Sequence, residues 1–293
     1  MCSLRLERLI NALACPKCQG VVHLKTNPSI VECCSCGEHY PIRGDTILFC
    51  EPGQPLDDLD ALKGRLKKKL GKLYYSHFRP LLAPAYPFRL RRYLAKYADP
   101  ATRLVIDLGS GNYRVHPDVF TVDIVQYENV DMVCDATRLP FRDSSIDLVT
   151  TSHVLEHAPS PETMISEIMR ITRPGGFGVH VVPFLYPFHA SPDDYQRYTN
   201  VGMARLFPGW AVKDQVPTAG PFSLFNAVVA ELFSTVLSRN NGKMKAIIYL
   251  LVAAILSPVK YLDVLFCGHP AFLPLAAVTL TTVEKPIVND CSD

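Results

Sequence analysis

Short apolar runs separated by polar turns dominate the middle of the chain. Three of these runs each carry an acidic residue near the C-terminal end, namely Asp107, Asp123 and Asp135. In an open parallel sheet those strand ends lie side by side, at the edge where ligands bind. The pattern therefore predicts an α/β fold with a small-molecule site at this edge.

Further strands and one amphipathic helix continue the pattern. Apolar runs at 147–151, 177–182, 211–216 and 276–283 predict four more strands. Residues 160–172 predict a helix, because Ser160, Pro161 and Glu162 form a typical helix start.

The segment at 222–270 interrupts this alternation with two apolar helices, predicted at 222–238 and 244–257. They carry almost no charge beyond Glu231, and lysines flank the second. No uncharged apolar run reaches the ~18 residues expected of a spanning helix, so an interfacial or buried position is expected. The insertion is interpreted as a roof over an acceptor pocket, as a dimer interface or as an ordinary core helix pair.

Composition narrows the picture only a little. The 293 residues carry a formal net charge of +2, which by itself does not imply nucleic-acid binding. The first residues lack the apolar core of a signal peptide. We expect a cytoplasmic protein, with peripheral contact at the inner face of a membrane as an open alternative.

The N-terminal module at 1–55 carries two CxxC pairs among the ten cysteines of the chain. Cys15 and Cys18 form the first pair, and Cys33 and Cys36 form the second. Two such turns brought together by a hairpin create a tetrahedral four-sulfur site, so a structural zinc ion is predicted. Whether Cys34 or His39 also binds the metal stays open, and a small core of buried thiols is the alternative.

A basic connector at 56–103 follows the cysteine module. Lysines and arginines between Lys63 and Lys72 alternate with leucines spaced four apart, and a second helix candidate at 88–97 carries three arginines. The simpler interpretation is a pair of helices that pack on the sheet with solvated charges. The alternative is an anionic partner, either a membrane surface or RNA.

The strand ends suggest particular contacts with a nucleoside cofactor. Gly109, Ser110 and Gly111 allow the backbone to approach a ligand closely. Asp123 can accept both hydroxyl groups of a ribose, and Asp135 with Ala136 can bind an adenine edge. A dinucleotide-binding unit has the same geometry, but the third glycine of its pattern is absent here.

Residues 104–182 resemble the class I S-adenosylmethionine-dependent methyltransferases of the type 11 group. The resemblance rests on Asp107-Leu-Gly-Ser-Gly111, Asp123, Cys134-Asp-Ala136, Leu139-Pro-Phe141, Val154-Leu-Glu-His157 and Arg173-Pro-Gly-Gly176. It implies a mostly parallel Rossmann-like sheet with one antiparallel strand, in a domain at 104–293.

The resemblance also assigns the cofactor, S-adenosylmethionine. Asp107, Gly109 and Gly111 would hold its methionine end, Asp123 the ribose and Asp135 the adenine. We add His153, which follows the fourth strand, to the expected cofactor-binding residues.

The cysteine module resembles the Trm112-like zinc-ribbon domain.

The spacing of the three acids departs from the family pattern. Gly111 and Asp123 are twelve positions apart, as are Asp123 and Asp135, whereas a parallel crossover normally needs a dozen or more connecting residues. Turns should therefore replace the flanking helices, and the zinc ribbon or the basic connector should cover the exposed sheet edge.

A loop at 183–200 carries the candidate catalytic residues. His189 or Asp194 could take a proton from an acceptor, Arg197 could hold an anionic substrate group, and Tyr195 lies between them. The alternative is an ordered loop in which Asp194 and Arg197 pair with each other. His153 and His157 would either orient this loop or react.

Three functions remain open from these observations. The first is methyl transfer from S-adenosylmethionine to a hydrophobic or lipid-linked small acceptor, indicated by the apolar insertion and the basic connector. The second is methylation of tRNA or rRNA, indicated by the ribbon and the same lysines. The third is a non-catalytic S-adenosylmethionine-binding module that docks a partner.

Overall fold

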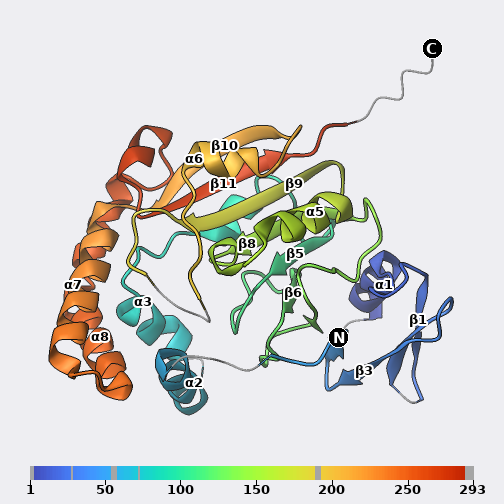
Figure 1. Cartoon of the computed structure of the whole chain (residues 1–293), viewed down its shortest axis with the longest axis horizontal. Helices are drawn as coiled ribbons and strands as arrows, with labels where there is room; N and C mark the ends of the chain where they lie inside the picture. The colour runs from blue at the N-terminus through green and yellow to red at the C-terminus, as the bar shows by residue number, and fades with distance from the viewer. Residues whose placement is uncertain (1–2, 28, 54–57, 72, 189–192, 288–293) are drawn as a thin grey trace.

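A computed structural model describes residues 3–27, 29–53, 58–71, 73–188 and 193–287 of the protein. Its centre is one mixed sheet whose strands follow the order β1-β2-β3-β4-β7-β6-β5-β8-β9-β11-β10 (Figure 1). The strands are β1 Val22–Lys25, β2 Ile30–Cys33, β3 His39–Arg43, β4 Thr46–Leu48, β5 Val105–Leu108, β6 Phe120–Asp123, β7 Met132–Val133, β8 Ile146–Ser152, β9 Thr172–Pro183, β10 Ala211–Ala219 and β11 Val278–Glu284.

The part of the sheet from β7 to β10 has the arrangement expected of a Rossmann-like methyltransferase. Strands β7, β6, β5, β8 and β9 are parallel, and β11 runs antiparallel between β9 and β10. Because β10 runs in the same direction as β5, the insertion that follows it leaves from the ligand edge of the sheet. The fold class predicted from the sequence is confirmed.

The cysteine module extends this sheet at its far edge. Strand β4 pairs in parallel with β7, so that Ile47 lies opposite Met132 and Leu48 lies opposite Val133. Helix α1, Ser3–Ala12, leads into an antiparallel bridge between Leu13 and Phe141. The exposed edge is therefore covered by the ribbon, one of the two possibilities the sequence left open.

The crossovers on both sides of β6 are short turns, as the spacing predicted. Within 104–133, all of which the structure describes, no helix separates β5, β6 and β7. The Arg114 guanidinium instead donates to both oxygens of the buried Asp131, at 2.7 and 2.9 Å, and to the carbonyl groups of Val119 and Asn129. This bidentate ion pair closes the turn where a helix normally packs.

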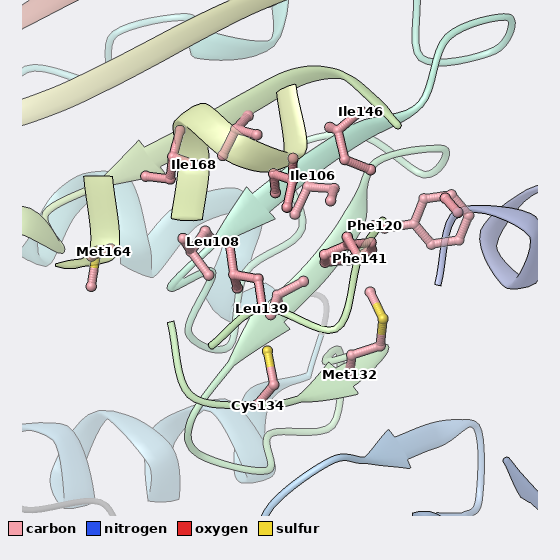
Figure 2. Close-up of a cluster of buried hydrophobic side chains, with 14 of the residues drawn as sticks. Ile106, Leu108, Phe120, Met132, Cys134, Leu139, Phe141, Ile146, Met164 and Ile168 are labelled. Atoms are coloured by element: carbon pink, nitrogen blue, oxygen red, sulfur yellow. The ribbon is translucent and has the colours of Figure 1, made fainter. Parts of the chain in front are cut away.

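Helices and helical turns surround the sheet (Figure 1). They are α2 Asp58–Leu70, the π-helical turn η1 Tyr74–Phe78, α3 Arg79–Leu82, α4 Leu90–Leu94, η2 Leu155–His157, α5 Pro161–Ile171, α6 Asn200–Arg205, α7 Pro221–Ser238, α8 Gly242–Leu256, η3 Val259–Leu265 and η4 Pro270–Leu275. Helix α5 packs Met164 and Ile168 against Ile106 and Leu108 on one face (Figure 2). Helix α4 packs on the opposite face, and α1 and β2 share the core with α5.

The insertion forms a helical hairpin of α7 and α8 beside the connector helices, at the end of the molecule far from the ribbon (Figure 1). Its polarity is inverted relative to a water-soluble helix pair. The buried positions of α7 are small or polar, and they include Ala227, Ala230 and Ser234. Large apolar side chains face outward instead, among them Leu232, Val236, Leu251 and Ile255, which are 57 to 76% exposed. The interpretation as an ordinary core helix pair is therefore wrong.

One expectation about the insertion needs correction. Helix α7 is long and apolar enough to cross a membrane, and α8 with η3 passes the same test as a pair bent by 55°. The sequence expectation considered only uncharged runs, and Glu231 interrupts the apolar run of α7. In the structure that carboxylate pairs with Lys245 Nζ at 2.6 Å, so its charge is offset within the hairpin.

Candidate functional site

A cleft of about 910 Å³ opens at the carboxyl ends of the central strands. It is bordered by six of the residues expected to contact a cofactor, namely Gly109, Gly111, Asp123, Asp135, Ala136 and His153. Asp107 and Ser110 border a second hollow of about 680 Å³ that shares Gly109 and His153 with the first. All of the residues expected to contact a cofactor thus lie at the same edge of the sheet.

Close packing explains why position 109 is a glycine. Gly109 has a φ of +73°, and a Cβ atom there would lie 2.3 Å from Cγ2 of Val154. Any side chain would both strain the backbone and collide with the residue that follows His153. The turn after β5 therefore passes directly along the cleft.

Asp107 is buried at the end of β5 and bears an unsatisfied oxygen. Its side chain is 5% exposed, and Oδ1 has no hydrogen-bond partner among the described residues. Burial, with a smaller contribution from the charge of Asp123, raises the pKa of Asp107 to about 7. A buried carboxylate of this kind fits a positively charged ligand group, such as the ammonium or sulfonium of S-adenosylmethionine.

The two other acids are held by backbone N–H groups. Asp123 accepts from the N–H of Gly111 at 2.8 Å and from that of Val125 at 2.9 Å, and burial raises its pKa. Each oxygen keeps a further lone pair, so both could accept a ribose hydroxyl. Asp135 is exposed, and its Oδ1 accepts from the N–H and the hydroxyl of Thr137. These carboxylate oxygens are therefore suited to accept hydrogen bonds from the nucleoside that the family resemblance assigns.

His153 stands between the two hollows in a strained conformation. Its φ of +56° is uncommon for a side chain other than glycine. Nδ1 lies 3.3 Å from Oε1 of Glu156, a carboxylate that is fully buried. This pairing fixes the imidazole where the cofactor cleft and the second hollow meet.

Cofactor affinity should depend on pH through Asp107. The folded-state pKa of about 7 means that most molecules carry the neutral acid at pH 6 and the carboxylate at pH 8. Because a cationic cofactor favours the carboxylate, we expect binding of S-adenosylmethionine to be up to ~10-fold weaker at pH 6 than at pH 8. Calorimetry in buffers of different ionisation enthalpy should detect the released proton. In Asp107→Asn this pH dependence should flatten; an equally steep profile in that variant would assign it to another group.

Three of the four residues predicted to be catalytic, Asp194, Tyr195 and Arg197, are among those the structure describes. Asp194 and Arg197 form a bidentate ion pair, and the Asp194 side chain is 1% exposed. Tyr195 is half exposed and donates its hydroxyl to Asp193 Oδ2 at 3.1 Å. None of these three residues borders the cleft or the second hollow, and His189 lies outside the described residues. The ion pair is the one expected of the ordered loop, and the catalytic role of these residues stays a prediction.

The loop is fastened to the turn that follows β8. His157 Nδ1 lies 2.6 Å from the carbonyl oxygen of Asp193, and the N–H of Tyr195 donates to the carbonyl of Glu156. His157 thus orients the loop, and it borders the cleft together with His153.

The four cysteines of the CxxC pairs converge on one point. The sulfur atoms of Cys15, Cys18, Cys33 and Cys36 all lie within 4.8 Å of one another. That spacing fits four sulfurs around one ion at ~2.3 Å. Backbone N–H groups, chiefly that of Cys36, lower the pKa of Cys33 to about 6, which favours the thiolate a metal needs.

Cys34 and His39 are engaged elsewhere. Cys34 Sγ lies 3.2 Å from His23 Nδ1, and His39 Nε2 lies 3.1 Å from Glu32 Oε1. The four-cysteine set therefore excludes both, which settles a point that the sequence left open.

Sequence reasoning missed several residues that shape the site. Ala85, Tyr186 and Val278 border the cleft although they are distant in sequence. Tyr113 and arginines of the basic connector border the second hollow, where solvated charges were expected. The arginine spacing at 89–92 was visible in the sequence, but it does not reveal which face meets the site.

A family model describes the central part of the chain. Residues 91–179 match the model described as a methyltransferase domain. An uncharacterized methyltransferase of Mycolicibacterium paratuberculosis is 36% identical over 96 residues, which are 32% of this chain and 37% of that protein. A demethylmenaquinone methyltransferase of Streptomyces avermitilis is 43% identical over 53 residues, which are 18% of this chain and 22% of that protein. The chain thus spans little more than a third of the first relative's length.

Solved structures with related folds are more distant in sequence. The cyclase SpnF aligns with a TM-score of 0.44 and 14% identity, over 81% of this chain and 100% of its own. The phosphoethanolamine N-methyltransferase 2 of Haemonchus contortus, solved with S-adenosyl-L-methionine, aligns with a TM-score of 0.43 and 14% identity, over 75% and 60%.

Proposed function

We propose that this protein transfers a methyl group from S-adenosylmethionine to a hydrophobic or lipid-linked acceptor. The match of residues 91–179 to the methyltransferase domain model supports the methyl transfer. The observation that supports the cofactor assignment is the buried, unsatisfied Asp107, which borders the second hollow beside the cleft that Asp123 and Asp135 border. Asp107 would hold the cationic end, Asp123 the ribose and Asp135 the adenine.

The chain would contribute positioning and exclusion of water. When bound, S-adenosylmethionine would supply the methyl group to a nucleophilic acceptor, and Asp107, Asp123 and Asp135 would orient it through its cationic end, its ribose and its adenine. Gly109 lets the backbone lie against the ligand, and the buried Glu156 fixes His153 beside the reacting region.

The inverted hairpin supports the choice of a hydrophobic acceptor. Small residues between helices with large apolar residues outside are the pattern of helices packed in lipid. Arg239, Lys243 and Lys245 gather at the turn between α7 and α8, where basic side chains can reach lipid headgroups. We propose that the hairpin lies in the interface of an anionic membrane, which places the protein at a membrane surface.

The four-sulfur cluster is proposed to hold one structural zinc ion. A closed four-cysteine site leaves no open coordination position, so the ion would stabilise the ribbon and take no part in methyl transfer.

A labelling experiment tests the acceptor class. Full-length protein, tritiated S-adenosylmethionine and a cell extract are incubated, and the extract is then separated into organic-soluble lipid, RNA and protein pools. The label is expected in the lipid pool. Label in RNA would establish the RNA methyltransferase instead, and binding without any transfer would establish a non-catalytic module.

Substitutions in the hairpin extend this test. Leu251→Glu with Ile255→Glu places two charges on its exposed face, and should lower both transfer to the lipid pool and flotation with phosphatidylglycerol vesicles by about tenfold. Val201→Glu, at a residue 58% exposed on α6, is the matched control. Equal flotation of all three proteins would contradict membrane contact through the hairpin.

A further inference from the structure

The hollow beside the cofactor cleft has an unusual charge. Its border includes four arginines, Arg79, Arg89, Arg91 and Arg92, and one carboxylate, the buried Asp107. Among the described residues, no carboxylate forms an ion pair with any of these four guanidinium groups. Arg79 instead stacks on the ring of Tyr113, with 3.8 Å between the guanidinium carbon and the ring centroid. The border of the hollow therefore carries four cationic groups against one carboxylate.

The insertion holds the segment between Arg79 and the other three arginines. The buried Lys260 ammonium donates to the carbonyl groups of Pro80 and Ala83, in and just after α3. The N–H of Tyr86 donates to Ser223 Oγ at 2.8 Å, and the Tyr86 ring meets Tyr261 edge-on. Residues 80–86 thus contact α7 and η3, so the segment that carries Arg79 and precedes the other three arginines is attached to the insertion.

Guanidinium groups are suited to one class of ligand above others. The planar N–H donors of a guanidinium group match two phosphate oxygens at once. An anion with more than one charge also offsets the repulsion between neighbouring guanidinium groups. The cofactor carboxylate carries one charge and needs one such partner, which leaves an excess of cationic groups. The hollow of about 680 Å³ is also concave and small, unlike the extended surface that a nucleic-acid backbone needs.

We propose that this hollow binds the phosphate or pyrophosphate group of the methyl acceptor. The inference rests on the proposed methyl transfer and names the class of its substrate. Gly109 and His153 border both spaces, so an acceptor anchored by its phosphate would present its nucleophile where the two spaces meet. The four arginines and the apolar hairpin then serve the two ends of one amphiphilic molecule.

Direct binding of inorganic pyrophosphate tests the proposal without relying on activity. Calorimetry on the full-length, zinc-loaded protein saturated with S-adenosylhomocysteine should show binding that Arg91→Gln with Arg92→Gln weakens by about tenfold or more. The affinity for S-adenosylhomocysteine itself should stay within about twofold. Arg43→Gln with Arg205→Gln, at two exposed arginines of β3 and α6, changes the net charge equally and should leave both affinities unchanged.

Two outcomes would overturn the proposal. One is unchanged pyrophosphate affinity in the Arg91/Arg92 variant together with weaker S-adenosylhomocysteine binding, which would assign these arginines to the cofactor carboxylate. The other is equal weakening in the control variant, which would reduce the effect to overall charge. A failure of methyl transfer would leave the pyrophosphate result intact, so the two hypotheses fail separately.

A comparison of ligands identifies the source of the phosphate. An isoprenyl pyrophosphate that binds more tightly than inorganic pyrophosphate indicates a lipid headgroup. Equal affinity indicates a soluble phosphorylated acceptor. The tighter binding should disappear in Leu251→Glu with Ile255→Glu if the hairpin receives the hydrocarbon chain.

Discussion

Serine at both Cys15 and Cys18 is expected to remove the metal from the protein and to weaken its cofactor site at the same time. Metal analysis should give about one zinc per chain in the unaltered protein and none in the variant, since two sulfurs cannot hold the ion alone. Binding of a structural zinc ion is worth on the order of 10 kcal/mol in isolated ribbons. The loss should therefore unfold at least the N-terminal module.

The effect should reach the cofactor because the module and the sheet are joined. Strand β4 pairs with β7, and the residues that follow β7 lead to Asp135. We expect weaker S-adenosylhomocysteine binding and a lower melting temperature, measured by calorimetry. Cys34→Ser is the matched control, because its sulfur lies outside the four-sulfur cluster. Retention of one zinc by the Cys15/Cys18 variant would contradict the assignment.

Alanine at Asp123 is expected to weaken S-adenosylhomocysteine binding at least tenfold, or ~1.4 kcal/mol. The structure adds a second cause to the lost ribose contact. Both oxygens of Asp123 also hold backbone N–H groups, those of Gly111 and Val125, so the variant loosens the loops on either side of the cleft. Isothermal calorimetry measures the affinity, and thermal unfolding reports how much of the loss comes from the loops.

Asp118→Ala provides the control for this substitution. Asp118 lies in the same crossover, and its side chain is about half exposed beside His116. Its removal should leave the affinity within about twofold. An Asp123 variant that binds as tightly as the unaltered protein would refute the ribose assignment.

The central strands and their three acids were predictable because they depend on local patterns. Short apolar runs define β5, β6 and β7, and because these strands are parallel the acids near their ends meet at one edge of the sheet. The missing helices were also predictable, since twelve residues cannot hold a strand and a helix. What replaces them was not predictable, because the pair of Arg114 with Asp131 forms only after folding.

The specificity elements were harder to predict, for a different physical reason. Asp194 and Arg197 are three positions apart, and sequence alone cannot tell a pair that orders a loop from one that meets a substrate. The arginines of the connector are exposed, and the sequence does not show that they border the second hollow. The residues that hold the neighbouring segment, Lys260 and Ser223, lie far along the chain. Likewise, the sequence does not show which face of α7 is covered by α8, and that contact decides which side chains of α7 are buried.

The position of β11 has a consequence for synthesis of the chain. This strand lies between β9 and β10, yet it emerges from the ribosome only after the whole apolar hairpin. Lys260, which caps α3, likewise appears 180 residues after Pro80. The nascent protein therefore displays its lipid-like hairpin while the sheet is still open, a stage at which exposed apolar surface invites aggregation. Early capture by a bilayer or a chaperone would protect the growing chain, so translation near a membrane should raise the yield of folded protein.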